Sequence, residues 1–165
     1  MQLNSYKKTY KTLVAEHAHK IEEIFPWDLF DEFDAGAAPL LLDIRCPNEF
    51  EGAHIDESLN VPRGILEIAV DYGYEETALE LVEARDRRVV VICRSGNRSV
   101  LAAYTLKLMG YSNVASLRTG LRGWNDYEQS MIDKQGNRLD LDSVDALFLT
   151  KVSPAQLGPI VSNAA

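Results

Sequence analysis

Residues 89–99, with the sequence VVVICRSGNRS, constrain the fold of this chain more than any other stretch. They begin with a short run of apolar, β-branched residues, which is typical of a strand buried on both faces in a parallel sheet. Residues 100–109 then follow a helical pattern, and Gly110 is placed to end that helix. Cys93 therefore lies on a tight loop between the end of a strand and the start of a helix. In open α/β sheets, ligands bind at such loops.

The loop around Cys93 has the composition of a site for a nucleophile and an anion. Backbone N–H groups of such a loop, with those of the first helical turn, point into one small bowl and favour a negative charge there. The two arginines act in the same direction and stabilise charge on the sulfur, and the glycine permits a cramped backbone. An inert buried cysteine would not explain these neighbours, so we interpret Cys93 as a nucleophile. The expected substrate-binding residues are Arg94, Ser95, Gly96, Asn97, Arg98 and Ser99.

The charge distribution favours a small anionic substrate. The formal net charge of the chain is −8, which argues against nucleic acid and anionic membranes as partners. Residues 85–122 nevertheless contain eight Lys or Arg and a single acidic residue, so a basic region surrounds Cys93 in an acidic chain. Within that region, Arg85, Arg87 and Arg88 are expected to lie in a solvated turn before the strand.

The motifs on both sides of this loop resemble those of the rhodanese family of sulfurtransferases, over about residues 20–128. The resemblance is carried by the loop, by Asp43-Ile44-Arg45, Glu49-Phe50, His54-Ile55 and Asn60-Val61-Pro62 before it, and by residues 110–114 and 120–124 after it. Two positions depart from the family pattern, because Ala53 and Thr119 stand where the family usually has glycine. Both departures concern the fit of the backbone.

Alternating strand and helix patterns predict an α/β fold with a mainly parallel sheet. The resemblance implies a rhodanese-like sheet of five strands with helices on both faces. We expect strands at residues 21–25, 40–44, 59–61, 89–92 and 114–117, and helices at 26–33, 65–70, 77–85, 100–109, 120–127, 143–148 and 154–160.

The predicted organisation is an N-terminal helical extension (1–20), a rhodanese-like domain (21–129) and a C-terminal extension (130–165). The helix at residues 6–20 is expected to pack on the domain rather than to mediate dimers. Phe148, Leu149 and Leu157 predict that the C-terminal tail docks on it.

Four residues before the loop are interpreted as structural support, namely Asp43, Arg45, Glu49 and His54. Arg45 and Glu49 are expected to form an ion pair that holds the following short helix, with Asp43 capping or bracing the loop. His54 is expected to be a hydrogen-bonded brace, because thiolate attack on a sulfane sulfur needs no general base. His17 and His19 do not have the spacing of metal ligands, so no metal site is predicted.

The resemblance implies a sulfurtransferase in which Cys93 takes sulfane sulfur from thiosulfate or a similar small anionic donor. The resulting transient cysteine persulfide, with no other cofactor, passes its sulfur to cyanide, a small thiol or a protein thiol. Two cysteines do not make a disulfide framework, no apolar run is long enough to span a membrane, and residues 1–20 lack the apolar stretch of a signal peptide. We therefore expect a reducing, cytoplasmic setting without a membrane partner.

Other functions remain open at this point. One is a persulfide carrier or redox sensor without turnover. Another is a cysteine phosphatase or arsenate reductase, whose signature has five residues between Cys and Arg, whereas four separate Cys93 from Arg98 and make a smaller bowl.

Cys46 also follows a predicted strand and could act as a resolving thiol toward Cys93. The simpler interpretation, which we favour, is a small residue at the start of a helix before Pro47.

Overall fold

The computed structural model describes residues 7–159; Tyr6 and Ile160, at the outer ends of two predicted helices, lie outside this range. One sheet of five parallel strands forms the centre, in the order β1-β5-β4-β2-β3. The strands are β1 (Glu22–Ile24), β2 (Leu40–Asp43), β3 (Leu59–Asn60), β4 (Arg88–Ile92) and β5 (Asn113–Leu117). This confirms the predicted fold class, with β4 in the middle of the sheet.

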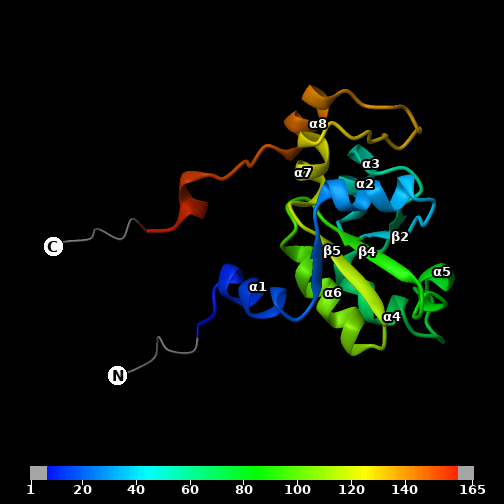
Figure 1. Cartoon of the computed structure of the whole chain (residues 1–165). Coiled ribbons are helices and arrows are strands. Elements are labelled where there is room, and N and C mark those ends of the chain that lie inside the picture. Colours follow the sequence, from blue (N-terminus) through cyan, green and yellow to red (C-terminus); the bar gives the residue numbers. More distant parts are fainter. Residues whose placement is uncertain (1–6, 160–165) are drawn as a thin grey trace, which may run out of the picture.

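Helices cover both faces of the sheet (Figure 1). They are α1 (Tyr10–Ala18), α2 (Pro26–Asp34), α3 (Pro47–Gly52), α4 (Leu66–Ala69), α5 (Leu79–Val82), α6 (Arg98–Leu108), α7 (Gly120–Asp126) and α8 (Leu141–Phe148), with 3₁₀ turns at Arg63–Ile65 and Pro154–Leu157. One apolar core joins the sheet to α4, α5 and α6, and the other joins it to α2, α7 and α8.

The sequence of β4 explains why it lies between two cores. Side chains alternate across a strand, so Val89 and Val91 belong to the core on the α6 side, and Val90 and Ile92 to the core on the α7 side. All four side chains are fully buried. A strand of this kind needs both faces covered, which is the arrangement of parallel sheets. It also fixes the place where the chain leaves the sheet, directly before Cys93.

Helices α1 and α8, which the predicted division places in the two extensions, pack on the helices of the central sheet. α1 lies against α6, where its Val14 is buried and the ring of its His17 meets the ring of Tyr104 edge-on, at 4.6 Å between centroids. α8 lies against α7 and buries Val144 and Phe148, which are one helical turn apart. The expected packing of the N-terminal helix on the domain is therefore confirmed.

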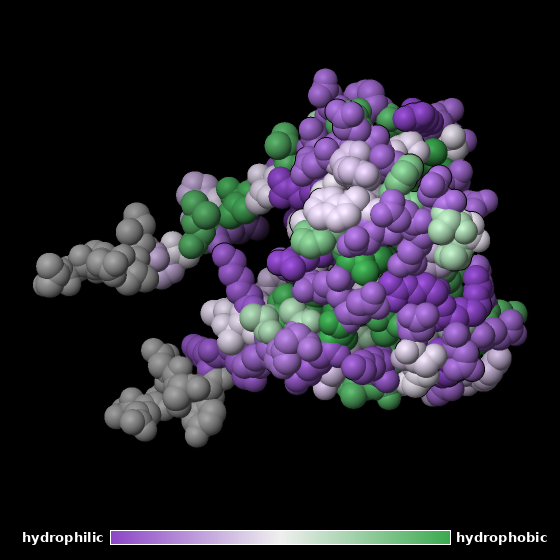
Figure 2. Space-filling model, viewed as in Figure 1, coloured by the Kyte–Doolittle hydropathy of each residue, from purple (hydrophilic) through white to green (hydrophobic). Residues whose placement is uncertain are grey.

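The last part of the described chain differs from the prediction. Phe148 docks as expected, but Leu149 and Leu157 do not, since their exposed fractions are 61% and 74%. Residues 149–159 leave the domain as an exposed segment without strands and with one 3₁₀ turn. Figure 2 shows green, apolar side chains of this segment standing away from the main body. Its few large apolar residues are too widely spaced to form a continuous buried face.

Two further predictions were wrong near β4. The helix expected at residues 77–85 is the single turn α5, because Thr77 Oγ1 donates a hydrogen bond to the carbonyl oxygen of Asp71 and holds a turn there instead. Arg85 and Arg88 are not merely solvated. Arg85 donates to three backbone carbonyl groups, and Arg88 forms ion pairs with Glu22 and Glu32. Arg87 is exposed, as expected.

No helix within residues 7–159 is long and apolar enough to cross a membrane.

Candidate active site

Cys93 begins the loop that joins β4 to α6, at the carboxyl edge of the sheet. The start of α7 holds this loop from the side. The backbone N–H of Leu121 donates to the carbonyl oxygen of Cys93 at 3.0 Å, and that of Arg122 to the carbonyl oxygen of Arg94 at 3.0 Å. The Cys93 loop is therefore held between the start of α6, into which it leads, and the first turn of α7.

Two glycines make this close approach possible. Gly96 has φ +85°, and a Cβ atom there would lie 2.7 Å from the backbone nitrogen of Thr119. Gly120 has φ +59°, and its Cβ would lie 2.5 Å from the carbonyl oxygen of Cys93. Both positions therefore require glycine. Thr119, at one of the departures from the family pattern, adopts a left-handed φ of +68°, a conformation that glycine adopts with less strain.

The Cys93 sulfur is buried and surrounded by hydrogen-bond donors. The backbone N–H groups of Gly96 and Ser99 donate to Sγ at 3.2 and 3.3 Å. The Cys93 thiol donates to the Ser99 hydroxyl oxygen at 3.3 Å, and that oxygen also accepts a hydrogen bond of 2.7 Å from the Ser116 hydroxyl. The two backbone N–H groups aimed at the sulfur stabilise negative charge on it when the thiol loses its proton.

A hollow of about 140 Å³ opens above the sulfur. It is lined by Tyr10, Cys93, Arg94, Ser95, Asn97 and Arg98. The structure thus brings together Cys93 and four of the six residues expected to bind a substrate there. The other two, Gly96 and Ser99, are buried below and supply N–H groups to the sulfur.

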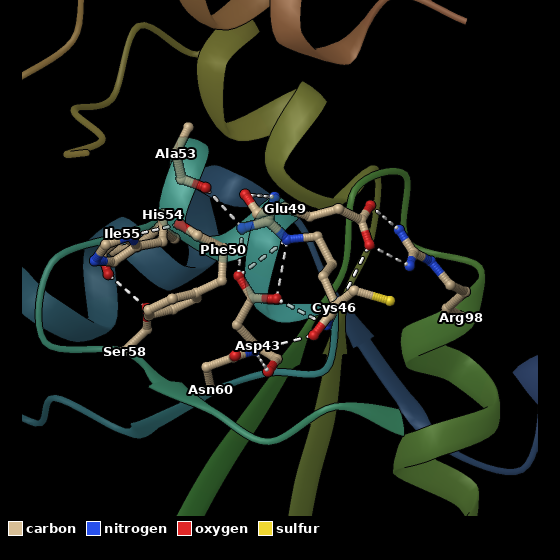
Figure 3. Close-up of polar contacts among 11 residues, drawn as sticks. Asp43, Cys46, Glu49, Phe50, Ala53, His54, Ile55, Ser58, Asn60 and Arg98 are labelled. Atoms are coloured by element: carbon tan, nitrogen blue, oxygen red, sulfur yellow. Dashed lines mark hydrogen bonds and ion pairs between the residues drawn. The ribbon is translucent and has the colours of Figure 1, made fainter. Parts of the chain in front are cut away.

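The ion pairs near the site differ from those predicted. Arg98 donates to both carboxylate oxygens of Glu49, at 3.1 and 2.9 Å, so Glu49 pairs with α6 and not with Arg45 (Figure 3). The Glu49 carboxylate also accepts the backbone N–H of Cys46 at 3.1 Å. The bond from Arg98 lowers the pKa of Glu49 to about 2, against burial, which acts in the opposite direction. The charge of Arg98 is therefore largely balanced within the protein.

Arg94 differs from Arg98 in this respect. Within residues 7–159 it has no ion-pair partner, and its Nε is buried without a hydrogen-bond partner. Its side chain lines the hollow above Cys93 and also a second hollow of about 230 Å³ that reaches Leu147 and Phe148 of α8. Arg94 is therefore the loop cation whose charge is open to a bound anion.

Arg45 is the buried brace of the edge next to the site. Its side chain, 1% exposed, donates to both carboxylate oxygens of Asp43 and to the carbonyl oxygens of Glu49 and Ala53. Asp43 also accepts the backbone N–H of Arg45. The two residues therefore tie the end of β2 to the middle of α3 and to the residue that follows it. They lie beside the loop and do not line the hollow above the sulfur.

Histidines are absent from the lining of that hollow. His54 stacks on Phe50 at 3.8 Å between ring centroids, and its Nδ1 lies 2.8 Å from the Phe50 carbonyl oxygen. His17 likewise meets the carbonyl oxygen of Leu13 through its Nδ1. Within residues 7–159, no group of three or more His, Cys, Asp or Glu side chains is arranged to hold a metal ion.

Two residues of the site were missed by the sequence analysis. Tyr10 comes from the extension before the resembling segment, more than eighty residues before the loop, and only the packing of α1 brings it to the hollow. Ser116 is the polar residue in the buried part of β5, next to apolar neighbours on both sides. That one polar side chain in a buried strand was the only local signal, since a buried hydroxyl needs a hydrogen-bond partner.

Fold and site together define an α/β domain with a buried, hydrogen-bonded cysteine at the carboxyl edge of a parallel sheet. The sequence profile of the family described as "Rhodanese-like domain" matches residues 28–127. The chain therefore belongs to the rhodanese-like domain family.

Individual relatives agree with this assignment. The chain is 33% identical over 110 residues to a Bacillus subtilis protein named "Putative sulfur carrier protein YrkF", covering 67% of this chain and 54% of that protein. It is 34% identical over 90 residues to "Putative thiosulfate sulfurtransferase, mitochondrial" of Schizosaccharomyces pombe, covering 53% of this chain and 63% of that protein. The chain thus spans less than two thirds of either relative.

Among solved structures, the chain is similar to a Rhodopseudomonas palustris protein of unknown function described as a possible tyrosine phosphatase. The TM-score is 0.69 at 29% identity, covering 78% of this chain and 98% of that one. The relatives of this chain are thus sulfurtransferases and sulfur carriers at modest identity, together with a structural neighbour of unestablished function.

Proposed function

We propose that this protein is a sulfurtransferase that carries sulfane sulfur on Cys93. The Cys93 thiolate attacks the outer sulfur of thiosulfate or a similar donor, a new S–S bond forms, and the old S–S bond breaks. Sulfite leaves with the electron pair of that bond, and Cys93 remains as a persulfide. A thiolate or cyanide then attacks the outer sulfur of the persulfide and regenerates the Cys93 thiolate.

The observation that carries this proposal is the set of donors around the Cys93 sulfur. The persulfide and the transition states on either side of it place negative charge on sulfur. N–H groups of Gly96 and Ser99, already oriented in the folded protein, offset that charge without reorganisation. The narrow hollow above Sγ suits a donor of a few atoms, and a protein acceptor would have to present its thiol at the hollow's mouth.

We assign to Arg94 the main contact with the negative charge of the sulfur donor. Both loop arginines were expected to orient an anion, but Glu49 already neutralises Arg98 and holds it at the start of α6. Arg94 has no such partner among the described residues and lines the hollow. In this proposal Arg98 mainly fixes the shape of the loop, while Arg94 contacts the oxyanion of the donor.

A persulfide carrier without turnover of its own is the second candidate, because one of the relatives is named as a sulfur carrier. The same Cys93 persulfide serves both functions, and they differ only in whether a small acceptor can discharge it. A reducing compartment would suit either one, since both require a cysteine thiol. A phosphatase is disfavoured because the loop has only four residues between Cys93 and Arg98, and because that arginine is bound by a carboxylate.

The test is a steady-state assay of thiocyanate formation from thiosulfate and cyanide. A sulfurtransferase should give parallel lines in double-reciprocal plots, as a two-step covalent route requires. A stable Cys93 persulfide without thiocyanate formation would assign the carrier function instead. Hydrolysis of p-nitrophenyl phosphate by the protein, in the absence of sulfur transfer, would contradict both.

A further inference from the structure

Helix α1 lies outside the part of the chain that matches the family, yet it forms one wall of the hollow above Cys93. Three residues of α1 share one face, because residues three or four apart lie on the same side of a helix. They are Tyr10, Val14 and His17. Val14 is buried and His17 meets Tyr104 of α6, so this face is the one turned to the domain. Tyr10 therefore lies on this face, one turn before Val14, where it lines the hollow and keeps an exposed fraction of 52%.

Contacts along the two helices show that α1 and α6 run in parallel. Early in both helices, Tyr10 and Arg98 line the same hollow. Further along, His17 meets Tyr104. Beyond the end of α1, Lys107 Nζ donates to the carbonyl oxygen of Lys20 at 2.8 Å. This alignment places the first turn of α1 over the first turn of α6, where the Cys93 loop ends.

The environment of the phenol suits a hydrogen-bond donor. Partial burial raises the pKa of Tyr10 above its ordinary value, and the nearby Cys93 acts in the same direction, while Arg98 and Arg94 lower the pKa. The hydroxyl therefore stays protonated at neutral pH. An anion bound above Cys93 would lie in the hollow that Tyr10 lines, on the open side of a sulfur whose buried side meets the N–H groups of Gly96 and Ser99.

We propose that the Tyr10 hydroxyl donates a hydrogen bond to the anionic group of the sulfur donor bound above Cys93, and so sets the preference of the site for oxyanions. This inference rests on the proposed function for its substrate, but the binding of an anion at Cys93 can be tested without any sulfur transfer. Tyr10 and Arg94 then hold the donor from two sides while Cys93 attacks its outer sulfur.

The experiment compares alkylation of Cys93 by iodoacetate, which is anionic, with alkylation by iodoacetamide, which is neutral. Rates are measured on the Cys93 peptide by mass spectrometry, so that reaction at the exposed Cys46 does not interfere. Tyr10→Phe removes the hydroxyl and keeps the ring. We expect it to lower the ratio of the iodoacetate rate to the iodoacetamide rate by about tenfold, because hydrogen bonds to charged groups are among the stronger ones. The concentration of thiosulfate that half-saturates persulfide formation should rise by a similar factor.

Tyr104→Phe is the matched control, since Tyr104 supports α1 through His17 but does not line the hollow. It should leave both readouts unchanged. An unchanged ratio in Tyr10→Phe, or an equal loss with both reagents, would overturn the role of Tyr10. Protein that forms no persulfide, but whose iodoacetate preference is present in the wild type and reduced in Tyr10→Phe, would contradict the proposed function and still support anion binding by Tyr10.

Discussion

Two turns of this protein have the same plan but different chemistry. β2 leads through Cys46 to α3, and β4 leads through Cys93 to α6, so both cysteines lie at the carboxyl edge of the same sheet. Cys93 is buried, and two backbone N–H groups point at its sulfur. Cys46 is exposed, and its own N–H donates to Glu49. The two cysteines therefore share a place at the sheet edge but differ in their surroundings. The shape of the loop that follows Cys93 directs N–H groups at its sulfur, and the turn that follows Cys46 does not bury the cysteine.

Replacing each cysteine by serine should give the largest difference between the two turns. Cys93→Ser should lower thiocyanate formation by about a thousandfold or more, because the nucleophile is lost. Cys46→Ser should stay within about twofold of wild type. Loss of turnover in Cys46→Ser, with the Cys93 persulfide still forming, would show that Cys46 acts as a resolving thiol.

Arg94 and Arg87 offer a second contrast between a cation at the site and one away from it. Arg94→Ala should raise the KM for thiosulfate by about 10- to 100-fold, since a hydrogen bond to a charged group is worth about 1.5–3 kcal/mol. Arg87→Ala removes the same charge from an exposed position before β4 and should change KM little. Equal effects of the two changes would mean that the general field, and not a contact, attracts the donor.

Glycine replacements compare the backbones of the two turns. Gly96→Ala should lower the free energy of unfolding by about 2 kcal/mol or more, because its positive φ and the close Thr119 nitrogen leave no place for a Cβ atom. Gly52→Ala, at the end of α3, would meet only Leu147 at 3.9 Å and should be tolerated. Chemical denaturation measures both. Similar losses would mean that the Cys93 loop is no more constrained than the Cys46 turn.

Glu49 joins the two turns, since it binds Arg98 and the N–H of Cys46. Its pKa is lowered from 4.5 to about 2 in the folded protein, so its stabilisation is present above pH 4.5 and is lost as the pH falls toward 2. Glu49→Gln should cost about 1 kcal/mol of unfolding free energy at pH 7, because the pair is partly exposed and screened. The difference from wild type should disappear at low pH. The exposed Glu76→Gln serves as the control, and a pH-independent difference for Glu49→Gln would contradict the ion-pair assignment.

Local sequence signals predicted most of the fold and the centre of the site. The apolar, β-branched run before Cys93 predicted a buried strand, and the loop residues that follow it are contiguous, so their convergence needed no long-range contact. The sequence pattern did not reveal which charged side chains pair. Arg45 could reach either Asp43 or Glu49, and the choice depends on Arg98, which approaches from α6 only in the folded protein. The place of Tyr10 depends in the same way on how α1 packs.

The division into an extension at residues 1–20, a domain at 21–129 and an extension at 130–165 stays a prediction. Both predicted extensions contact the predicted domain near the site. Ile132 exchanges two backbone hydrogen bonds with His54, at 3.0 and 2.9 Å, and Tyr10 borders the hollow above Cys93. Segments outside the family's matched region therefore contact the residues around the site, which a pattern restricted to that region does not reveal.

The central claim is that Cys93, and not Cys46, carries the sulfur. Mass spectrometry of the protein after incubation with thiosulfate tests this most directly, with peptide mapping under non-reducing conditions. We predict a gain of one sulfur atom, about 32 Da, on the peptide that contains Cys93, and none in Cys93→Ser. A gain confined to the Cys46 peptide, or none on wild-type protein, would contradict it.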